Sequence, residues 1–181
     1  MIWFTADLHI GHKNVIDYCR RPFVTVDEMN EVIMDNILEF VGRGDILYIL
    51  GDSGYSSGKI EALLKFLIMQ GVQVHYIWGN HDDSSKIKRA INDNCVWTGD
   101  LKYITIEEQK IMLSHYCMRT WRSSVHGAWN LYGHSHGDLE DIGLQYDVGV
   151  DNNGYFPVSW DELKVIMANK KQIHINHHKE E

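Results

Sequence analysis

The sequence predicts an α/β fold in which two β-sheets form a sandwich flanked by helices. Two observations predict it. In the first half of the chain, short apolar runs of strand type alternate with segments of helical periodicity. In the second half, short strand-like segments dominate until a last helix. This change of pattern favours a layered domain with sheet at its core.

The first half predicts three strands and three helices. The strands are Ile2–Ala6, Ile46–Leu50 and Val72–Trp78, and the second is continuous enough to be buried on both faces of a parallel sheet. Helical spacing predicts a helix that is capped by Asp27 and ends near Gly42. Two further helices are expected over Ile60–Ile68 and Ser84–Ile91.

The second half predicts a hairpin, two more strands and a final helix. Leu101–Ile106 and Lys110–Ser114 form the hairpin, and short strands follow near Ala128–Tyr132 and Leu144–Val148. Ser159 is expected to cap the final helix. We expect one domain over residues 1–170, followed by a polar C-terminal tail over residues 171–181.

Composition limits the function classes. The formal net charge of −8 disfavours a protein that coats nucleic acid by charge alone, although a short or single-stranded substrate stays open. No stretch approaches the roughly 20 apolar residues that span a bilayer, so no membrane partner is expected. Three cysteines without a CxxC motif indicate a reduced, cytoplasmic setting.

Polar side chains follow five of the predicted strands. Because ligands bind at the carboxyl ends of the strands of an open α/β sheet, we expect these side chains to meet there. The segments are Asp7-Leu8-His9, Gly51-Asp52, Gly79-Asn80-His81-Asp82, Ser114-His115 and Gly133-His134-Ser135-His136.

These residue types indicate a metal centre. Two Asp, one Asn and four His offer oxygen and imidazole nitrogen, which favours Mn, Fe, Zn or Ni over Ca or Mg. Seven ligands exceed the need of one catalytic ion, whereas two ions about 3.5–4 Å apart that share a carboxylate would use them all. Asp7 and His9 are two residues apart, as are His134 and His136, so on an extended backbone each pair would point to one face. The glycines at 51, 79 and 133 would let the chain turn beside a crowded centre.

The five segments, in this order, resemble the signature of the calcineurin-like metallophosphoesterase superfamily. Further stretches resemble a small single-domain subgroup found in bacteria and their viruses. The resemblance implies the same sandwich, in four layers of α/β/β/α order. The stretches are His9-Ile10-Gly11-His12-Lys13-Asn14, Ser114-His115-Tyr116, Arg119-Thr120-Trp121 and Asp147-Val148-Gly149-Val150-Asp151.

The resemblance also implies a role for each residue. Asp7, His9 and His136 would hold the first metal, Asn80, His115 and His134 the second, and Asp52 would bridge both. His81 would face the substrate without binding metal, and Asp82 would orient its imidazole. Mn is the expected metal of both sites.

The expected activity is hydrolysis of a phosphate ester. Metal binding lowers the pKa of water from about 15.7 to roughly 7 in favourable zinc sites, so a hydroxide bridging both ions would attack phosphorus in line with the leaving oxygen. His81 is expected to protonate that oxygen as general acid. A phosphodiester or nucleotide is a better expected substrate than a phosphoprotein, because a single domain leaves little surface for a large partner.

Two other functions stay open: a single-strand nuclease built on the same centre, and an interaction module that has lost catalysis. A module of that kind should have lost ligands, and none is lost here. His12, Asn14 and Arg119 are candidates for substrate contacts. The cations Lys13, Arg20, Arg21, Arg119 and Arg122 near the strand ends either hold a phosphate or are solvated surface charges.

Overall fold

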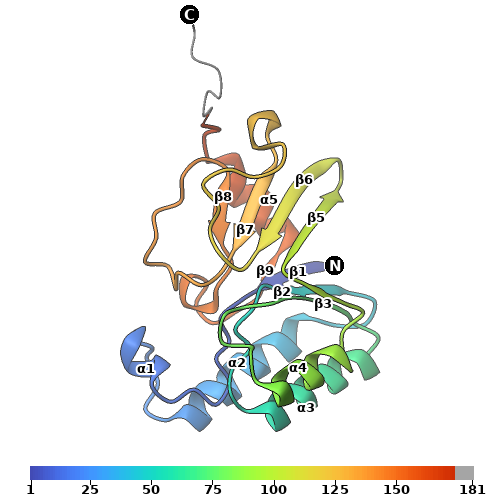
Figure 1. Cartoon of the computed structure of the whole chain (residues 1–181), viewed down its shortest axis with the longest axis vertical. Coiled ribbons are helices and arrows are strands. Elements are labelled where there is room, and N and C mark those ends of the chain that lie inside the picture. Colours follow the sequence, from blue (N-terminus) through green and yellow to red (C-terminus); the bar gives the residue numbers. More distant parts are fainter. Residues whose placement is uncertain (174–181) are drawn as a thin grey trace, which may run out of the picture.

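The computed structural model describes residues 1–173 and contains two mixed β-sheets (Figure 1). The first sheet has the strand order β4-β3-β2-β1-β9. Its first four members run parallel, and β9 pairs antiparallel with β1 at the edge. The strands are β1 (Ile2–Thr5), β2 (Ile46–Ile49), β3 (Gln73–Ile77), β4 (Trp97–Gly99) and β9 (Val158–Ser159).

The second sheet has the strand order β5-β6-β7-β8. The strands β5 and β6 form the predicted antiparallel hairpin, whereas β6, β7 and β8 run parallel. The strands are β5 (Leu101–Ile106), β6 (Gln109–Ser114), β7 (Trp129–Tyr132) and β8 (Gln145–Asp147).

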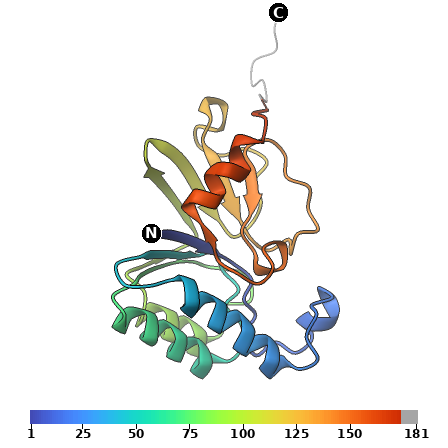
Figure 2. The same cartoon turned by 180° about the vertical axis from the view of Figure 1, so that it is seen from behind.

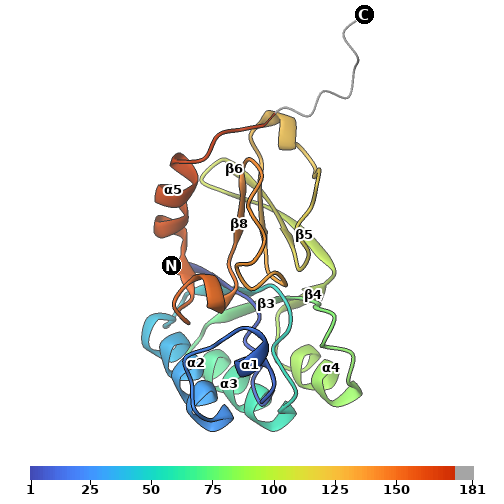
Figure 3. The same ribbon diagram turned by 90° about the vertical axis from the view of Figure 1, so that its left-hand side faces the viewer.

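Helices flank the two sheets, as the sequence predicts. Figure 1 shows the five-stranded sheet between the four-stranded sheet and three helices, α2 (Val26–Phe40), α3 (Ser57–Met69) and α4 (Ser85–Asn92). The last helix, α5 (Trp160–Ala168), lies against the four-stranded sheet (Figures 2 and 3). Its Trp160 ring is 5.2 Å from that of Trp129 on β7. The short helices α1 (Val15–Tyr18), η1 (Ser124–His126) and η2 (Val150–Asn152) lie in loops.

The central strands are buried on both faces, as predicted for the second apolar run. Along β2, Leu47 and Ile49 pack with the helices. Tyr48, and Leu50 just beyond the end of the strand, pack toward the second sheet. Successive strand side chains point to opposite faces, so one short apolar run serves two hydrophobic clusters. This double burial fixes the position of each strand end, and the candidate site residues follow those ends.

The helix starts confirm one predicted cap and correct another. The hydroxyl of Ser159 accepts a hydrogen bond from the amide of Glu162 at 3.2 Å, and its own amide donates to the Glu162 carboxylate. The prediction of Asp27 as a cap was wrong. Thr25 caps α2, because it forms the same reciprocal box with Glu28 and leaves Asp27 inside the first turn.

The predicted tail, residues 171–181, lies outside the described residues from position 174 onward. Within residues 1–173, none of the helices combines the length and the apolar character that a bilayer crossing requires.

Candidate metal centre

The seven predicted metal ligands come together where the strands of both sheets end. Their side chains form two clusters joined by Asp52. In each of two triads the donor atoms lie within 4.8 Å of one another. The first triad is Asp7, His9 and His136, and the second is Asp52, His115 and His134. Asn80 joins the second, with its Oδ1 3.0 Å from Nε2 of His115.

The carboxylate of Asp52 lies between the two clusters. Its Oδ2 atom is 3.7 Å from Nε2 of His9 and 3.5 Å from Nε2 of His115. The Asp52 side chain is 99% buried, so water does not screen these contacts. One carboxylate oxygen is therefore shared by a histidine of each cluster.

Most of these residues occupy left-handed turns and not the extended backbone that their spacing suggested. Positive φ angles occur at five of the seven: Asp7 (58°), His9 (52°), Asp52 (56°), His134 (70°) and His136 (51°). Such a conformation costs of order 1–3 kcal/mol in a residue other than glycine and persists where its surroundings enforce it. The prediction that His134 and His136 point to one face was wrong, because their side chains lie in different clusters.

Two glycines let the loops approach one another closely. A Cβ atom on Gly79 would lie 2.2 Å from Oδ1 of Asp52, and one on Gly51 would lie 2.5 Å from Nδ1 of His115. Gly51 also has a φ of 94°. The prediction that glycine permits crowding at these strand ends is confirmed.

Proton positions in the second cluster fit a cation. Nδ1 of His115 is 2.7 Å from the carbonyl oxygen of Leu50, so this nitrogen carries the ring proton. In the neutral imidazole Nε2 is then a lone pair, and it faces the oxygen atoms of Asn80 and Asp52. A metal ion between these three atoms would be bound by all of them.

The first cluster also contains unsatisfied buried acceptors. Oδ1 of Asp7 and Nε2 of His9 are buried without a hydrogen-bond partner. Burial, followed by repulsion from Asp147 and Asp52, raises the pKa of Asp7 well above its usual value, although the His134 amide opposes the shift. Burial and the charge of Arg21 lower the pKa of His9. A bound cation would satisfy both atoms, so the residues present fit a metal site.

Two acidic residues, Asp147 at the end of β8 and Asp151 just beyond it, hold the turn that carries His134 and His136. The carboxylate of Asp147 accepts hydrogen bonds from the hydroxyl of Ser135 at 2.7 Å and the amide of Gly137 at 3.0 Å. Oδ2 of Asp151 lies 2.6 Å from Nδ1 of His136. The family resemblance includes the stretch Asp147–Asp151 but gives neither residue a role. Their position could have indicated one, because β8 runs parallel to β7 and ends at the same edge.

The imidazole of His81 lies beside the first cluster, and its ring centroid is 5.4 Å from that of His9. Its Nδ1 atom is 2.9 Å from the hydroxyl of Tyr55, and its backbone amide donates to Oδ1 of Asp52 at 2.8 Å. Tyr55 was not predicted, because nothing in its sequence neighbourhood marks it.

The expected contact between Asp82 and the His81 imidazole is not formed. The Asp82 carboxylate points inward and accepts hydrogen bonds from the backbone amides of Asp52, Ser53 and Gly79 and from the hydroxyl groups of Ser53 and Tyr76. Burial raises the pKa of Asp82, against the effect of these bonds. Asp82 therefore holds the loop that carries Asp52, and the orienting role we expected for it was wrong.

The sequence comparison identifies the family. Residues 1–180 match the calcineurin-like phosphoesterases. The chain belongs to this family. It is accordingly a metal-dependent phosphoesterase, and its two mixed sheets flanked by helices are the calcineurin-like fold.

Several proteins of known sequence or structure resemble this phosphoesterase along most or part of its length. It is 29% identical over 179 residues to the uncharacterized protein MJ1445 of Methanocaldococcus jannaschii, covering 95% of this chain and 94% of that protein. It is 37% identical over 89 residues to the Gene 66 protein of Mycobacterium phage L5, covering 48% and 42%. The crystal structure of the protein of unknown function AQ665 from Aquifex aeolicus has a TM-score of 0.69 at 23% identity, covering 92% and 98%, and shows the same fold.

The three predicted substrate residues of this phosphoesterase lie in different surroundings. His12 is near the centre: its Nδ1 is 3.2 Å from Nδ1 of His9, and its ring is 4.5 Å from that of Tyr55. Asn14 is exposed at the start of α1. Arg119 is exposed beside a depression whose lining includes none of the candidate ligands, so the structure does not bring it to the cluster.

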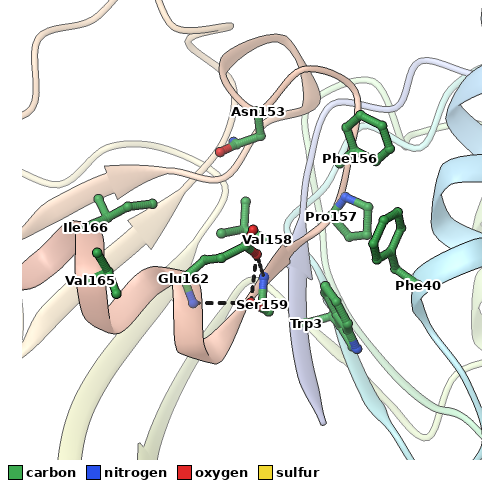
Figure 4. A pocket seen from close by; sticks show the side chains of 10 residues that line it. All are labelled: Trp3, Phe40, Asn153, Phe156, Pro157, Val158, Ser159, Glu162, Val165 and Ile166. Atoms are coloured by element: carbon green, nitrogen blue, oxygen red, sulfur yellow. Dashed lines mark hydrogen bonds between the residues drawn. The ribbon is translucent and has the colours of Figure 1, made fainter.

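Two cavities differ in their relation to this centre. A cavity of about 540 Å³ adjoins it and is lined by Asn80, Trp78, Tyr116 and Lys88, among others. A mainly apolar cavity of about 740 Å³ lies between α2, β9 and α5, with Phe40 and Phe156 on one side (Figure 4). None of the candidate ligands lines the apolar cavity. Of these two cavities, only the first is lined by a predicted ligand, Asn80.

Proposed function

We propose that the protein is a dinuclear phosphoesterase that hydrolyses phosphodiesters or nucleotides. Asp7, His9 and His136 would hold the first metal, Asn80, His115 and His134 would hold the second, and Asp52 would be shared by both. Mn is the proposed ion at both positions, since mixed nitrogen and oxygen ligands suit it better than Ca or Mg.

One observation carries this proposal: the buried Asp52 carboxylate lies between two clusters of potential metal ligands. Its Oδ2 lies 3.7 Å from Nε2 of His9 and 3.5 Å from Nε2 of His115. In a buried site, a cation placed between a carboxylate and imidazole nitrogens at such distances would be strongly stabilised. A single cation would leave one cluster unsatisfied, so the arrangement supports two.

Bound divalent ions would activate water and neutralise the phosphate charge. The part proposed for His81 is to deliver a proton to the leaving oxygen from Nε2. The contact between its Nδ1 and the hydroxyl of Tyr55 supports this role, because a hydroxyl can either donate or accept a hydrogen bond. Nε2 can therefore carry a proton whether the imidazole is neutral or charged.

The cavity beside Asn80 supports a nucleotide or diester substrate. Trp78 and Tyr116 in its lining offer aromatic faces for a base. Lys88 in the same lining is paired with Asp83 at 2.9 Å, so the aromatic faces carry this support. The net charge of −8 disfavours long nucleic acid, which makes a small substrate preferable to a single strand of DNA. The free cysteines Cys19, Cys95 and Cys117 support a reducing, cytoplasmic location.

A panel of substrates tests the proposal on the Mn-loaded protein. It contains p-nitrophenyl phosphate, bis-p-nitrophenyl phosphate, cyclic nucleotides and single-stranded DNA, each measured with and without a chelator. We expect chelator-sensitive hydrolysis of the diesters or nucleotides, and two metal ions per chain. Protein that binds two ions and hydrolyses none of these esters would overturn the proposed activity. Preferred cleavage of the single strand would favour the nuclease.

A further inference from the structure

Arg21 is a buried cation and not a surface charge. Its side chain is 0% exposed. All five of its N–H groups have acceptors: both carboxylate oxygens of Asp151, at 2.8 and 2.7 Å, the carbonyl oxygens of Asp7 and Leu8, at 2.7 and 3.2 Å, and the sulfur of Met29. With every donor occupied and no exposed surface, Arg21 cannot hold a phosphate, and it is not a solvated cation.

Asp151 connects this guanidinium to a predicted metal ligand. Its Oδ2 atom, which already accepts from Arg21, also lies 2.6 Å from Nδ1 of His136. A carboxylate can only accept, so Nδ1 of His136 carries a proton, and in the neutral imidazole Nε2 is the lone pair. Hydrogen bonding to one ring nitrogen in this way fixes which nitrogen is free to bind a metal.

The pair therefore joins the two turns that supply the first cluster. Arg21 holds the turn Asp7-Leu8-His9 through the carbonyl groups of Asp7 and Leu8, and Asp151 holds the turn of His136 through its imidazole. Both turns contain residues with positive φ, which need outside support. Among the hydrogen bonds of residues 1–173, none connects either partner to the side chains of Asn80, His115 or His134.

Stability alone explains this pair poorly. A buried ion pair loses as much in desolvation as it gains in attraction, and its replacement by apolar residues is often neutral. Two charges buried between ligand-bearing turns instead favour a role in positioning.

We infer that Arg21 and Asp151 form a positioning pair that sets the affinity of the first metal position selectively. This inference rests on the proposed dinuclear function. Neither residue touches substrate, and both act through His136 and the backbone of Asp7 and Leu8. The partner hydrogen bonded to a metal-binding histidine typically contributes 10–100-fold to metal affinity.

The test measures Mn²⁺ binding by isothermal titration calorimetry. The EPR spectrum then distinguishes two magnetically coupled Mn²⁺ ions from an isolated one. In Asp151→Asn we expect the Mn²⁺ affinity of one site, the first metal position, to fall by about 10–100-fold and that of the other site to stay unchanged. The coupled-pair signal should give way to that of an isolated ion. Equal weakening of both sites, or of neither, would overturn the inference.

A second variant keeps the test decisive if Asp151→Asn does not fold. The double change Arg21→Met and Asp151→Leu removes both buried charges together, so no unpaired charge remains. It should fold and show the same selective loss. Asp161→Asn is the matched control, because it breaks an exposed ion pair to Lys164 on α5, and we expect it to leave both metal affinities unchanged.

A measurement on the unmodified, metal-free protein is independent of any variant. Nitrogen-15 NMR of the imidazoles should show a proton on Nδ1 of His136, and a proton on Nε2 alone would contradict the inference. Failure of the proposed function is distinguishable: unmodified protein that binds fewer than two ions refutes the dinuclear centre itself. If the unmodified protein binds two ions but the variants lose no affinity selectively at one site, only the positioning pair is refuted.

Discussion

The hydroxyl of Tyr55 lies 2.9 Å from Nδ1 of His81, while the backbone amide of His81 donates to Oδ1 of Asp52. His81 is thus held at two points. Its ring contacts the tyrosine, and its backbone donates to the carboxylate in the middle of the candidate metal centre. This arrangement holds His81 beside the centre, where it belongs to neither of the two ligand triads.

Replacing His81 by alanine should separate metal binding from proton donation. We expect His81→Ala to keep both metal ions and to lose about 10²–10⁴-fold in turnover on esters with poor leaving groups. Esters of p-nitrophenol should lose less, because that leaving group needs little protonation. Rates across a series of leaving-group pKa values provide the measurement, and equal losses along the series would rule out the acid role.

Adding one methyl group at Gly79 should disturb the centre. The new Cβ would lie 2.2 Å from Oδ1 of Asp52, so Gly79→Ala has to displace the carboxylate or the loop. We expect a loss of about 1–3 kcal/mol in the free energy of unfolding, together with weaker metal binding. Denaturant unfolding and Mn²⁺ titration measure the two effects.

Gly58→Ala is the matched control for that substitution. A Cβ at Gly58, inside α3, meets no atom within 4 Å. It should leave metal binding unchanged and leave stability equal or slightly higher, since alanine favours the helix by roughly 0.5–1 kcal/mol. Similar behaviour of the two variants would contradict the crowding argument.

Removing divalent metal should destabilise the protein. Buried acceptors at Asp7 and His9 then lack a partner, and Asp7 is repelled by Asp147 and Asp52. A ligand at 100 times its Kd stabilises the folded state by about 2.7 kcal/mol, so each saturated metal site should raise Tm measurably. Thermal unfolding with Mn²⁺ and with a chelator provides the comparison, and equal Tm values would contradict a metal site here.

His75 should make stability depend on pH. Its ring stacks on Tyr48 at 4.9 Å, and its buried Nδ1 has no hydrogen-bond partner. Burial, followed by the charge of Lys102, lowers the pKa of His75 from 6.5 to about 4. Between these two pH values the unfolded chain binds a proton that the folded protein does not, so stability falls as the pH falls from 6.5 to 4.

His75→Phe isolates this contribution, because it keeps an aromatic ring and removes the titration. The free energy of unfolding of the variant should fall less between pH 7 and pH 4 than that of the unmodified protein. Denaturant unfolding across this range measures the difference, and parallel curves would show that His75 does not titrate on unfolding.

The sequence predicts the strands well because they are short apolar runs with polar residues directly behind them. It misses β4 and β9, which have three and two residues and show no pattern of their own. The sequence pattern places the cap of α2 two residues late. The actual cap, Thr25, lies before the first residue that shows helical spacing, and it forms its capping box with Glu28.

The positions of the candidate ligands directly after strands predict which residues they are, but these positions do not predict their backbone geometry. Left-handed turns at Asp7 and His136 leave no trace in hydrophobic periodicity. Sequence neighbours need not be partners: Asp82 follows His81 directly, yet its carboxylate binds the loop of Asp52. Arg21 and Asp151 are 130 residues apart, so no local pattern could pair them.

A crystal soaked in Mn²⁺ and measured at the manganese absorption edge tests the central claim most directly. We expect two anomalous peaks. One should lie among Asp7, His9 and His136, the other among Asn80, His115 and His134, with the carboxylate of Asp52 between them. A single peak, or peaks away from these side chains, would contradict a dinuclear centre.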